Sequence, residues 1–164
     1  MENVVVVRHG TYNVCGTHTD HSLTADGRWL MQLLGRHLSG IIPREGLEIL
    51  SSPLKYACES ADILANTFHV TSSVHQLLQV DPDYWIDEID RVMEFIGEHA
   101  HAETGTLMLV THNEYAQELL PRIARKRFPH KSSHNLSLGY AEAAILDWNR
   151  GDIQTIAPYA WMRR

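Results

Sequence analysis

The feature that most constrains the fold is a run of four valines close to the amino terminus. Val4–Val7 has no polar residue at alternate positions, which is typical of a β-strand covered on both faces. Strands of this kind occur mainly in parallel sheets that carry helices on both sides. The run therefore indicates an α/β fold.

Two further runs predict buried strands, and two more predict a hairpin. Leu47–Leu50 and Leu107–Val110 repeat the apolar pattern of the first strand. Ala143–Trp148 and Ile153–Ala157 flank Asn149–Asp152, which has the Asn, Gly and Asp residues typical of a hairpin turn. Together these segments predict a mostly parallel sheet with an antiparallel edge formed by the C-terminal strands.

Helical patterns lie between the predicted strands. One helix should begin after Thr24, a favourable N-cap, and end at Gly40. A second should follow the strand at 47–50, and a third should follow Asp83. A fourth should follow His112, where Pro121 should kink or restart it. The apolar faces are expected to comprise Leu30, Leu33, Leu34 and Leu38 in the first helix, Ala57, Ala61, Leu64 and Ala65 in the second, and Ile86, Ile89, Met93 and Ile96 in the third.

Length and composition fit one domain. A chain of 164 residues, 44% of them hydrophobic, can bury a sizeable core, and no repeat or linker divides it. We therefore expect a single domain over residues 1–164, a three-layer α/β/α sandwich around the mostly parallel central sheet. The net charge of −6 provides no global basic field for nucleic acid. No run is long enough for a signal peptide or a membrane span, so we expect a cytoplasmic protein with Cys15 and Cys58 as free thiols.

Three polar segments directly follow the predicted parallel strands. The carboxyl ends of such strands lie along one edge of the sheet, where ligands bind in open α/β folds. We expect His9 and His112 to face one another across a pocket at this edge, with Arg8 reaching into the same space. Gly10 would permit the chain to turn after the strand. The segments are Arg8-His9-Gly10, Ser51-Ser52-Pro53 and Thr111-His112-Asn113.

These residue types suit the transfer of a phosphoryl group. A neutral imidazole such as that of His9 can attack phosphorus with one ring nitrogen while an acceptor holds the other. The equatorial oxygens then need fixed positive donors, which Arg8 and a protonated His112 would supply. An Arg-His-Gly tripeptide is common by chance, but its position after four valines makes it informative.

The ordered motifs of the chain resemble those of the histidine phosphatase (phosphoglycerate mutase-like) superfamily. The short stretch before Leu107 is similar to the compact branch that contains the phosphohistidine phosphatase SixA. The resemblance implies a hydrolase that forms phosphohistidine on His9, with Arg8 and His112 in the phosphate pocket and no metal or organic cofactor. It implies a phosphohistidine protein or a small phosphorylated compound as substrate. The motifs that carry it are Val4–Gly10, Leu23–Gly27, Ser51–Leu54 and Leu109–Asn113.

One position departs from the family pattern. The resemblance implies a second pocket arginine, in the pattern S-P-L-x-R-A, where this chain has Tyr56. Tyrosine offers one neutral donor, and losing a donor to a transition-state oxyanion costs roughly 3–4 kcal/mol, or ~10²–10³ in rate. Lys55 should project about 100° away around the helix axis. A weak phosphatase is therefore expected, and the alternative is a non-catalytic phosphate-binding protein.

The sequence offers several candidates for the general acid and for the additional donors to phosphate. Asp81 or Asp83 could protonate an alkyl leaving group, whereas a phosphohistidine leaving group needs little protonation. Asn13, Asn113 and Ser137 could donate hydrogen bonds to the substrate phosphate. Tyr56 is placed with Asn13 and Asn113 among the candidate substrate-binding residues.

Two other clusters have weaker functional interpretations. His18, Asp20 and His21 carry ligand-type side chains, but a metal site there is less favoured than a solvated loop near the pocket mouth. A basic run is expected to be a solvated helix face, or else to guide a phosphorylated ligand. No aromatic platform accompanies it, so no nucleic-acid partner is expected. The run comprises Arg122, Arg125, Lys126, Arg127 and Lys131.

Overall fold

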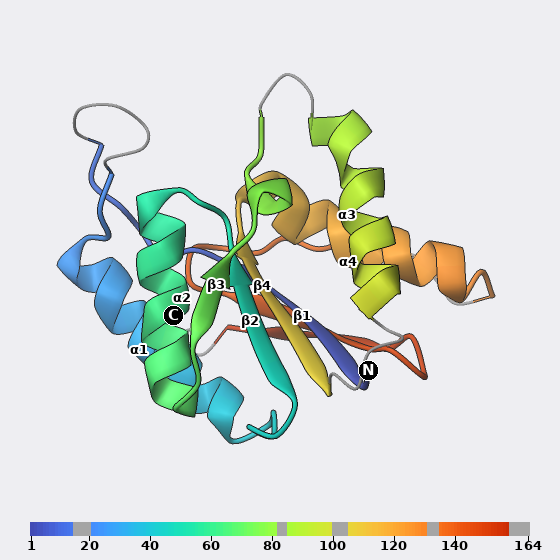
Figure 1. Cartoon of the computed structure of the whole chain (residues 1–164), viewed down its shortest axis with the longest axis horizontal. Helices are drawn as coiled ribbons and strands as arrows, with labels where there is room; N and C mark the ends of the chain where they lie inside the picture. Colours follow the sequence, from blue (N-terminus) through green and yellow to red (C-terminus); the bar gives the residue numbers. More distant parts are fainter. Residues whose placement is uncertain (15–20, 82–84, 100–104, 131–134, 158–164) are drawn as a thin grey trace.

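The computed structural model describes residues 1–14, 21–81, 85–99, 105–130 and 135–157. These residues form a six-stranded sheet in the order β3-β2-β4-β1-β5-β6 (Figure 1). The first four strands in this order are parallel, and β5 and β6 are antiparallel. The prediction of a mostly parallel sheet with an antiparallel C-terminal edge is confirmed. The strands are β1 (Asn3–Arg8), β2 (Leu47–Ser51), β3 (Ser72–Val74), β4 (Thr106–Thr111), β5 (Ala143–Asp147) and β6 (Ile153–Ile156).

Helices cover both faces of the sheet, so the predicted three-layer arrangement is also confirmed. One face carries α1 (Ala25–Ser39) and α2 (Lys55–Phe68), and the other carries α3 (Trp85–His99) and α4 (Asn113–Arg127) (Figure 1). A short 3₁₀ helix, η2 (Gln76–Leu78), follows β3. None of the described helices has the length and apolar character needed to cross a bilayer.

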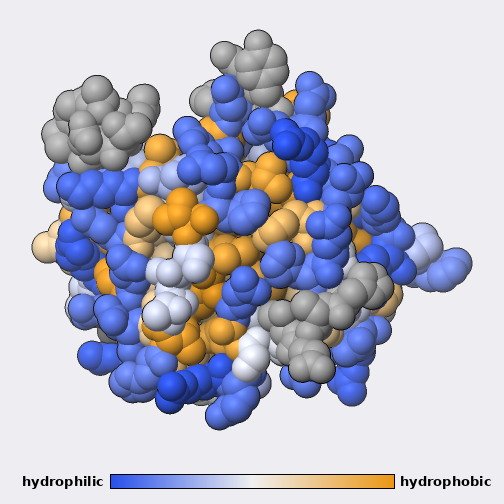
Figure 2. Space-filling view, in the orientation of Figure 1, coloured by the Kyte–Doolittle hydropathy of each residue, from blue (hydrophilic) through white to orange (hydrophobic). Residues whose placement is uncertain are grey.

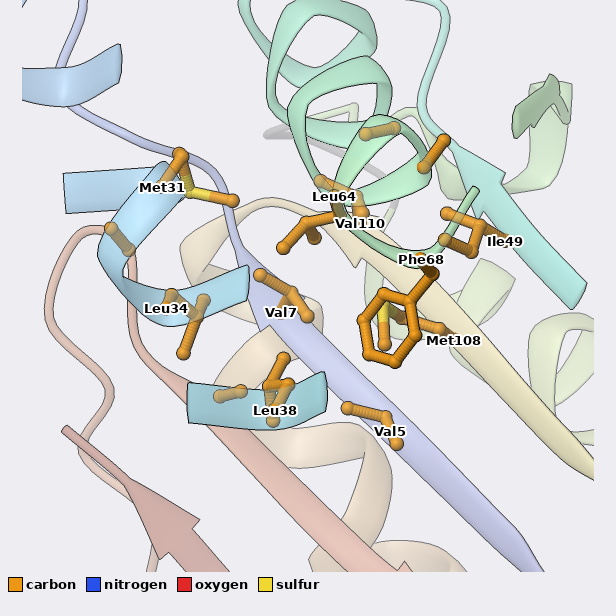
Figure 3. Close-up of a cluster of buried hydrophobic side chains, with 14 of the residues drawn as sticks. Val5, Val7, Met31, Leu34, Leu38, Ile49, Leu64, Phe68, Met108 and Val110 are labelled. Atoms are coloured by element: carbon orange, nitrogen blue, oxygen red, sulfur yellow. The ribbon is translucent and has the colours of Figure 1, made fainter. Parts of the chain in front are cut away.

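The four valines of β1 explain why this strand lies at the centre. All four are fully buried. Val5 and Val7 point into the core on the α1/α2 side, where Figure 3 shows them beside Leu34 and Leu38. Val4 and Val6 belong to the core on the α3/α4 side. Alternate side chains of one strand thus enter two separate cores, which is what an unbroken apolar run predicts.

The start of α1 packs closely against the segment after β1. The Thr24 hydroxyl accepts a hydrogen bond from the Gly27 N–H at 2.9 Å, which confirms the predicted N-cap. A Cβ atom at Gly27 would lie 2.2 Å from the Thr11 carbonyl oxygen, and one at Gly10 would lie 2.9 Å from the Gly27 carbonyl oxygen. Gly10 does not have a positive φ. Glycine is therefore required here by the close approach of the two segments and not by an unusual turn.

Two details of the helices differ from the sequence-based predictions. Ile86 is 58% exposed, and Val92 is buried in its place beside Ile89 and Ile96. Ile86 lies in the first turn of α3, before the part of that helix that meets the sheet. The helix α4 continues through Pro121 instead of restarting there. The residues around this proline are buried, and their packing compensates for the lost backbone hydrogen bond.

The strand β3 was not predicted, and it forms one edge of the sheet. It has three residues, too few for a clear period-two pattern. Val74 in this strand is 53% exposed, and Figure 2 shows further hydrophobic side chains on this face of the molecule. Such a short edge presents few unpaired backbone groups to another chain.

Candidate active site

Three strands end side by side and bring the predicted segments together. Arg8 in β1 is in register with Thr111 in β4, and Ser51 in β2 is in register with Val110. The ladder continues past the strand ends, because the His9 N–H donates to the Thr111 carbonyl oxygen at 3.2 Å. The ring centroids of His9 and His112 are 5.4 Å apart. The two histidines therefore face one another at the carboxyl edge of the sheet.

The same edge holds a pocket of about 510 Å³. Its residues come from β1, from the starts of α2 and α4, from the segment after η2 and from the segment before β5. Arg8, His9 and His112 all reach it. The described residues that line it are Arg8, His9, Tyr12, Leu54, Tyr56, Gln79, Val80, His112, Asn113, Glu114 and Tyr140.

The imidazole of His9 is held in one orientation and kept uncharged. Its Nδ1 lies 2.8 Å from the Gly10 carbonyl oxygen, which can only accept a hydrogen bond. The proton therefore lies on Nδ1, and Nε2 carries the lone pair. The Gly10 N–H donates to the buried Ser60 hydroxyl at 3.1 Å, which fixes this turn on α2. Burial lowers the pKa of His9 to about 3. The Gly10 hydrogen bond opposes this shift, and the charges of His112 and Arg8 add smaller lowering effects.

His112 is fixed between two hydroxyl groups at the start of α4. Its Nε2 lies 2.7 Å from the Ser52 hydroxyl, and its Nδ1 lies 3.4 Å from the Tyr56 hydroxyl. Burial lowers the pKa of His112 to about 4. At neutral pH His112 is therefore an uncharged imidazole, and the condition for a second charged donor, a protonated ring, is not met.

Arg8 supplies a permanent positive charge to the pocket and retains an unused donor. Its Nη1 donates to the Leu138 carbonyl oxygen at 2.8 Å, and its Cζ lies 4.1 Å from the centre of the Tyr140 ring. The Nε atom is buried and has no hydrogen-bond partner among the described residues. A buried guanidinium donor without a partner is costly, and an anion in the pocket would satisfy it.

The segment that holds Arg8 contains a strained residue. Ala141 is fully buried at a φ of 54°, a conformation that L-residues other than glycine rarely adopt. Its N–H donates at 3.1 Å to the carbonyl oxygens of both Arg8 and His9. The strain therefore coincides with the contact that ties this segment to the strand end carrying the two residues.

Tyr56 stands where the family pattern has an arginine, and aromatic rings surround it. Its ring stacks on Tyr12 with centroids 4.2 Å apart and an interplanar angle of 9°, and it lies 4.4 Å from the ring of His9. The ring of Tyr12 also stacks on that of His21, with centroids 5.4 Å apart. Burial is the main cause that raises the pKa of Tyr56, so its hydroxyl stays neutral. Lys55 is exposed and does not line the pocket.

The other sequence-based candidates divide between pocket and surface. Asn113 lines the pocket, and its side-chain oxygen accepts from Gln117 at 2.7 Å. Asn13 and Ser137 are exposed and outside the lining. Asp81 is also outside it, whereas its neighbours Gln79 and Val80 line the pocket. Asp83, His18, Asp20, Lys131 and Cys15 lie outside the described residues.

Among the described residues, neither a metal site nor the basic run contributes to this pocket. No three His, Cys, Asp or Glu side chains there come together as a metal site. The pocket lies at the start of α4, and the basic residues lie in its last two turns. Arg122 contacts Glu118 across one turn of the helix.

Sequence reasoning missed several pocket residues, among them Tyr12, Tyr140 and Glu114. Tyr12 and Tyr140 lie in segments without a regular pattern, and nothing in the sequence links them to Tyr56 or Arg8. Glu114 had a usable signal, because it comes two residues after His112 at the start of a predicted helix.

Comparison with known proteins gives a family match and similar solved structures. The family model described as histidine phosphatase superfamily (branch 1) matches residues 4–79. The structure of the protein histidine phosphatase SixA complexed with tungstate is similar at a TM-score of 0.71, with 16% identity over 95% of this chain and 97% of that chain. A mycobacterial glucosyl-3-phosphoglycerate phosphatase with inorganic phosphate gives a TM-score of 0.64, with 15% identity over 96% of both chains.

At these identities the two structures establish a shared fold and no more. No curated protein sequence matches the chain. The family match includes β1, α1, β2 and α2, and so contains Arg8, His9 and Tyr56. The remaining strands and helices complete the fold seen in the similar structures. Residues 4–79 therefore match the histidine phosphatase superfamily, and the chain shares the fold of the similar structures.

Proposed function

We propose that this chain is a single-domain phosphatase that works through a phosphohistidine intermediate on His9. The observation that carries the proposal is the fixed, neutral imidazole of His9, whose Nδ1 is held by Gly10 so that Nε2 keeps its lone pair. A nucleophilic imidazole requires this protonation state. The substrate would be a phosphohistidine protein or a small phosphorylated compound, as the names of the similar structures suggest.

The neighbours of His9 have matching roles in this proposal. Arg8 would bind an equatorial phosphoryl oxygen through its unused Nε donor. His112 and Tyr56 would hydrogen-bond to other oxygens as neutral groups. The hydroxyl of Ser52 would hold the His112 ring at Nε2 while the group moves from substrate to enzyme.

The direct test combines turnover with detection of the intermediate. We expect steady hydrolysis of 4-nitrophenyl phosphate, whose leaving group departs without protonation. Quenching the reaction in base should leave phosphate on the protein that is stable in base and lost in acid. Turnover without such a phosphoprotein would contradict the covalent mechanism.

The second candidate function is a non-catalytic phosphate-binding protein. The observation that favours it is Tyr56, a neutral residue in the place of a charged arginine, buried between Tyr12 and His9. A binder of this kind would take up phosphate or vanadate with a measurable Kd but would not hydrolyse 4-nitrophenyl phosphate.

Replacing Tyr56 by arginine tests how much lower kcat/KM is with tyrosine than with arginine at this position. Tyr56→Arg restores a charged forked donor, so kcat/KM for 4-nitrophenyl phosphate should rise ~10-fold or more. Lys55→Arg, at the adjacent exposed position, is the matched control and should change little. Thermal unfolding of both variants would show whether loss of the Tyr12 stack has disturbed the fold. Unchanged kcat/KM in a well-folded Tyr56→Arg protein would mean that the site is built around tyrosine.

A further inference from the structure

The charges of the described pocket residues cancel at neutral pH. Arg8 is the one permanent cation among them and Glu114 is the one carboxylate. His9 and His112 are neutral because burial lowers the pKa of each imidazole. A phosphate monoester with an uncharged remainder would therefore bring two negative charges to a pocket with no net positive charge. The electrostatic balance improves if the substrate itself carries a positive group.

Glu114 supplies the one negative charge among the described residues that line the pocket. It is the second residue of α4, two residues after His112, and it lines the pocket. The pKa of Tyr56 is raised mainly by burial, then by Tyr12 and then by the negative charge of Glu114. Glu114 therefore lies close enough to Tyr56 to influence its ionisation. It has no ion-pair partner among the residues that the structure describes.

Aromatic and aliphatic side chains line the same pocket as this carboxylate. They are Tyr12, Tyr56, Tyr140, Leu54 and Val80. A pocket that combines one carboxylate with such groups suits an alkylated ammonium group, which sheds part of its hydration more readily than a metal ion does.

We propose that the pocket selects a zwitterionic phosphomonoester, an alkyl phosphate with an ammonium or quaternary ammonium group, which Glu114 binds while Arg8 and His9 engage the phosphoryl group. The inference rests on the proposed phosphatase function and assigns its substrate class. A glutamate in the first turn of a helix also stabilises the helix dipole. That structural role alone predicts an effect of Glu114→Gln on stability and none on substrate choice.

The experiment compares two substrates of the same shape that differ in one charge. Choline phosphate has a quaternary nitrogen where 3,3-dimethylbutyl phosphate has a carbon atom. We expect wild-type kcat/KM to favour choline phosphate at least ~10-fold, equivalent to about 1.4 kcal/mol. Glu114→Gln should reduce this ratio to near one. The matched control Glu118→Gln, one turn further along α4 and outside the pocket, should keep the wild-type ratio.

The other outcomes overturn the inference in recognisable ways. Equal use of both alkyl phosphates by the wild type, with 4-nitrophenyl phosphate still hydrolysed, would reject the substrate class and leave the phosphatase function standing. If Glu114→Gln lowered kcat on both alkyl phosphates equally and spared 4-nitrophenyl phosphate, Glu114 would be a proton donor to the leaving group instead. If no phosphate were hydrolysed, the phosphatase function would fail, and calorimetric Kd values for the same pair would still test the charge preference.

Discussion

His9→Ala is expected to lose all measurable hydrolysis of 4-nitrophenyl phosphate, a fall in kcat of at least ~10⁴-fold. The reason is that the phosphoryl group then has no acceptor in the described pocket. His112 has Nε2 at the Ser52 hydroxyl, and its Nδ1, near Tyr56, would donate to a phosphoryl oxygen, so neither nitrogen would attack. Initial rates at one pH measure the effect, and the phosphoprotein trapped in base should disappear with it.

The control for this variant separates lost chemistry from lost folding. His9 is 4% exposed, so its removal leaves a small cavity beside Tyr56. The thermal unfolding midpoint should therefore be measured for His9→Ala, and His37→Ala on the exposed surface of α1 should behave like the wild type. Substantial turnover by a folded His9→Ala protein would rule out phosphohistidine at this residue and point to direct attack by water.

The free energy of unfolding is expected to fall by about 4 kcal/mol between pH 7.5 and pH 5. Burial lowers the pKa of His9 to about 3 and that of His112 to about 4 in the folded protein. In the unfolded chain both would titrate near 6.5. Below that pH the unfolded chain therefore binds about two more protons than the folded one, and each costs about 1.4 kcal/mol per pH unit.

Stability rises with pH because the pKa of each of the two histidines is lower in the folded protein than in the unfolded chain. Stability from the two neutral histidines is fully present above pH 6.5 and declines as the pH falls. The decline from His112 ends near pH 4 and that from His9 near pH 3, where the folded protein also takes up the proton. Urea unfolding at several pH values measures the slope.

Single substitutions show which residues cause the pH dependence of the free energy of unfolding. His9→Asn and His112→Asn should each remove about half of the pH dependence, because each deletes one of the two buried titrating groups. His37→Asn, at an exposed position, should leave the slope unchanged. An undiminished slope in both buried-site variants would mean that other groups take up the protons.

The sequence by itself determined the framework of this protein. The valine run of β1, the apolar runs of β2 and β4 and the Thr24 cap are local signals, because each depends on residues close together in the chain. The polar segments that follow these strands predicted where the pocket lies, since parallel strands place their carboxyl ends along one edge. Pairing of Arg8, His9 and His112 was therefore foreseeable from order and pattern.

The tertiary structure alone decided the electrostatics of the pocket. The neutral state of His112 depends on burial beneath segments distant in the chain, and sequence reasoning could name a charged donor there only on condition that the ring is protonated. The stack of Tyr12 on Tyr56 and the contacts of Leu138 and Tyr140 with Arg8 join residues up to 132 positions apart. Desolvation and ring stacking depend on distances between such segments, and no periodicity or motif within one segment records them.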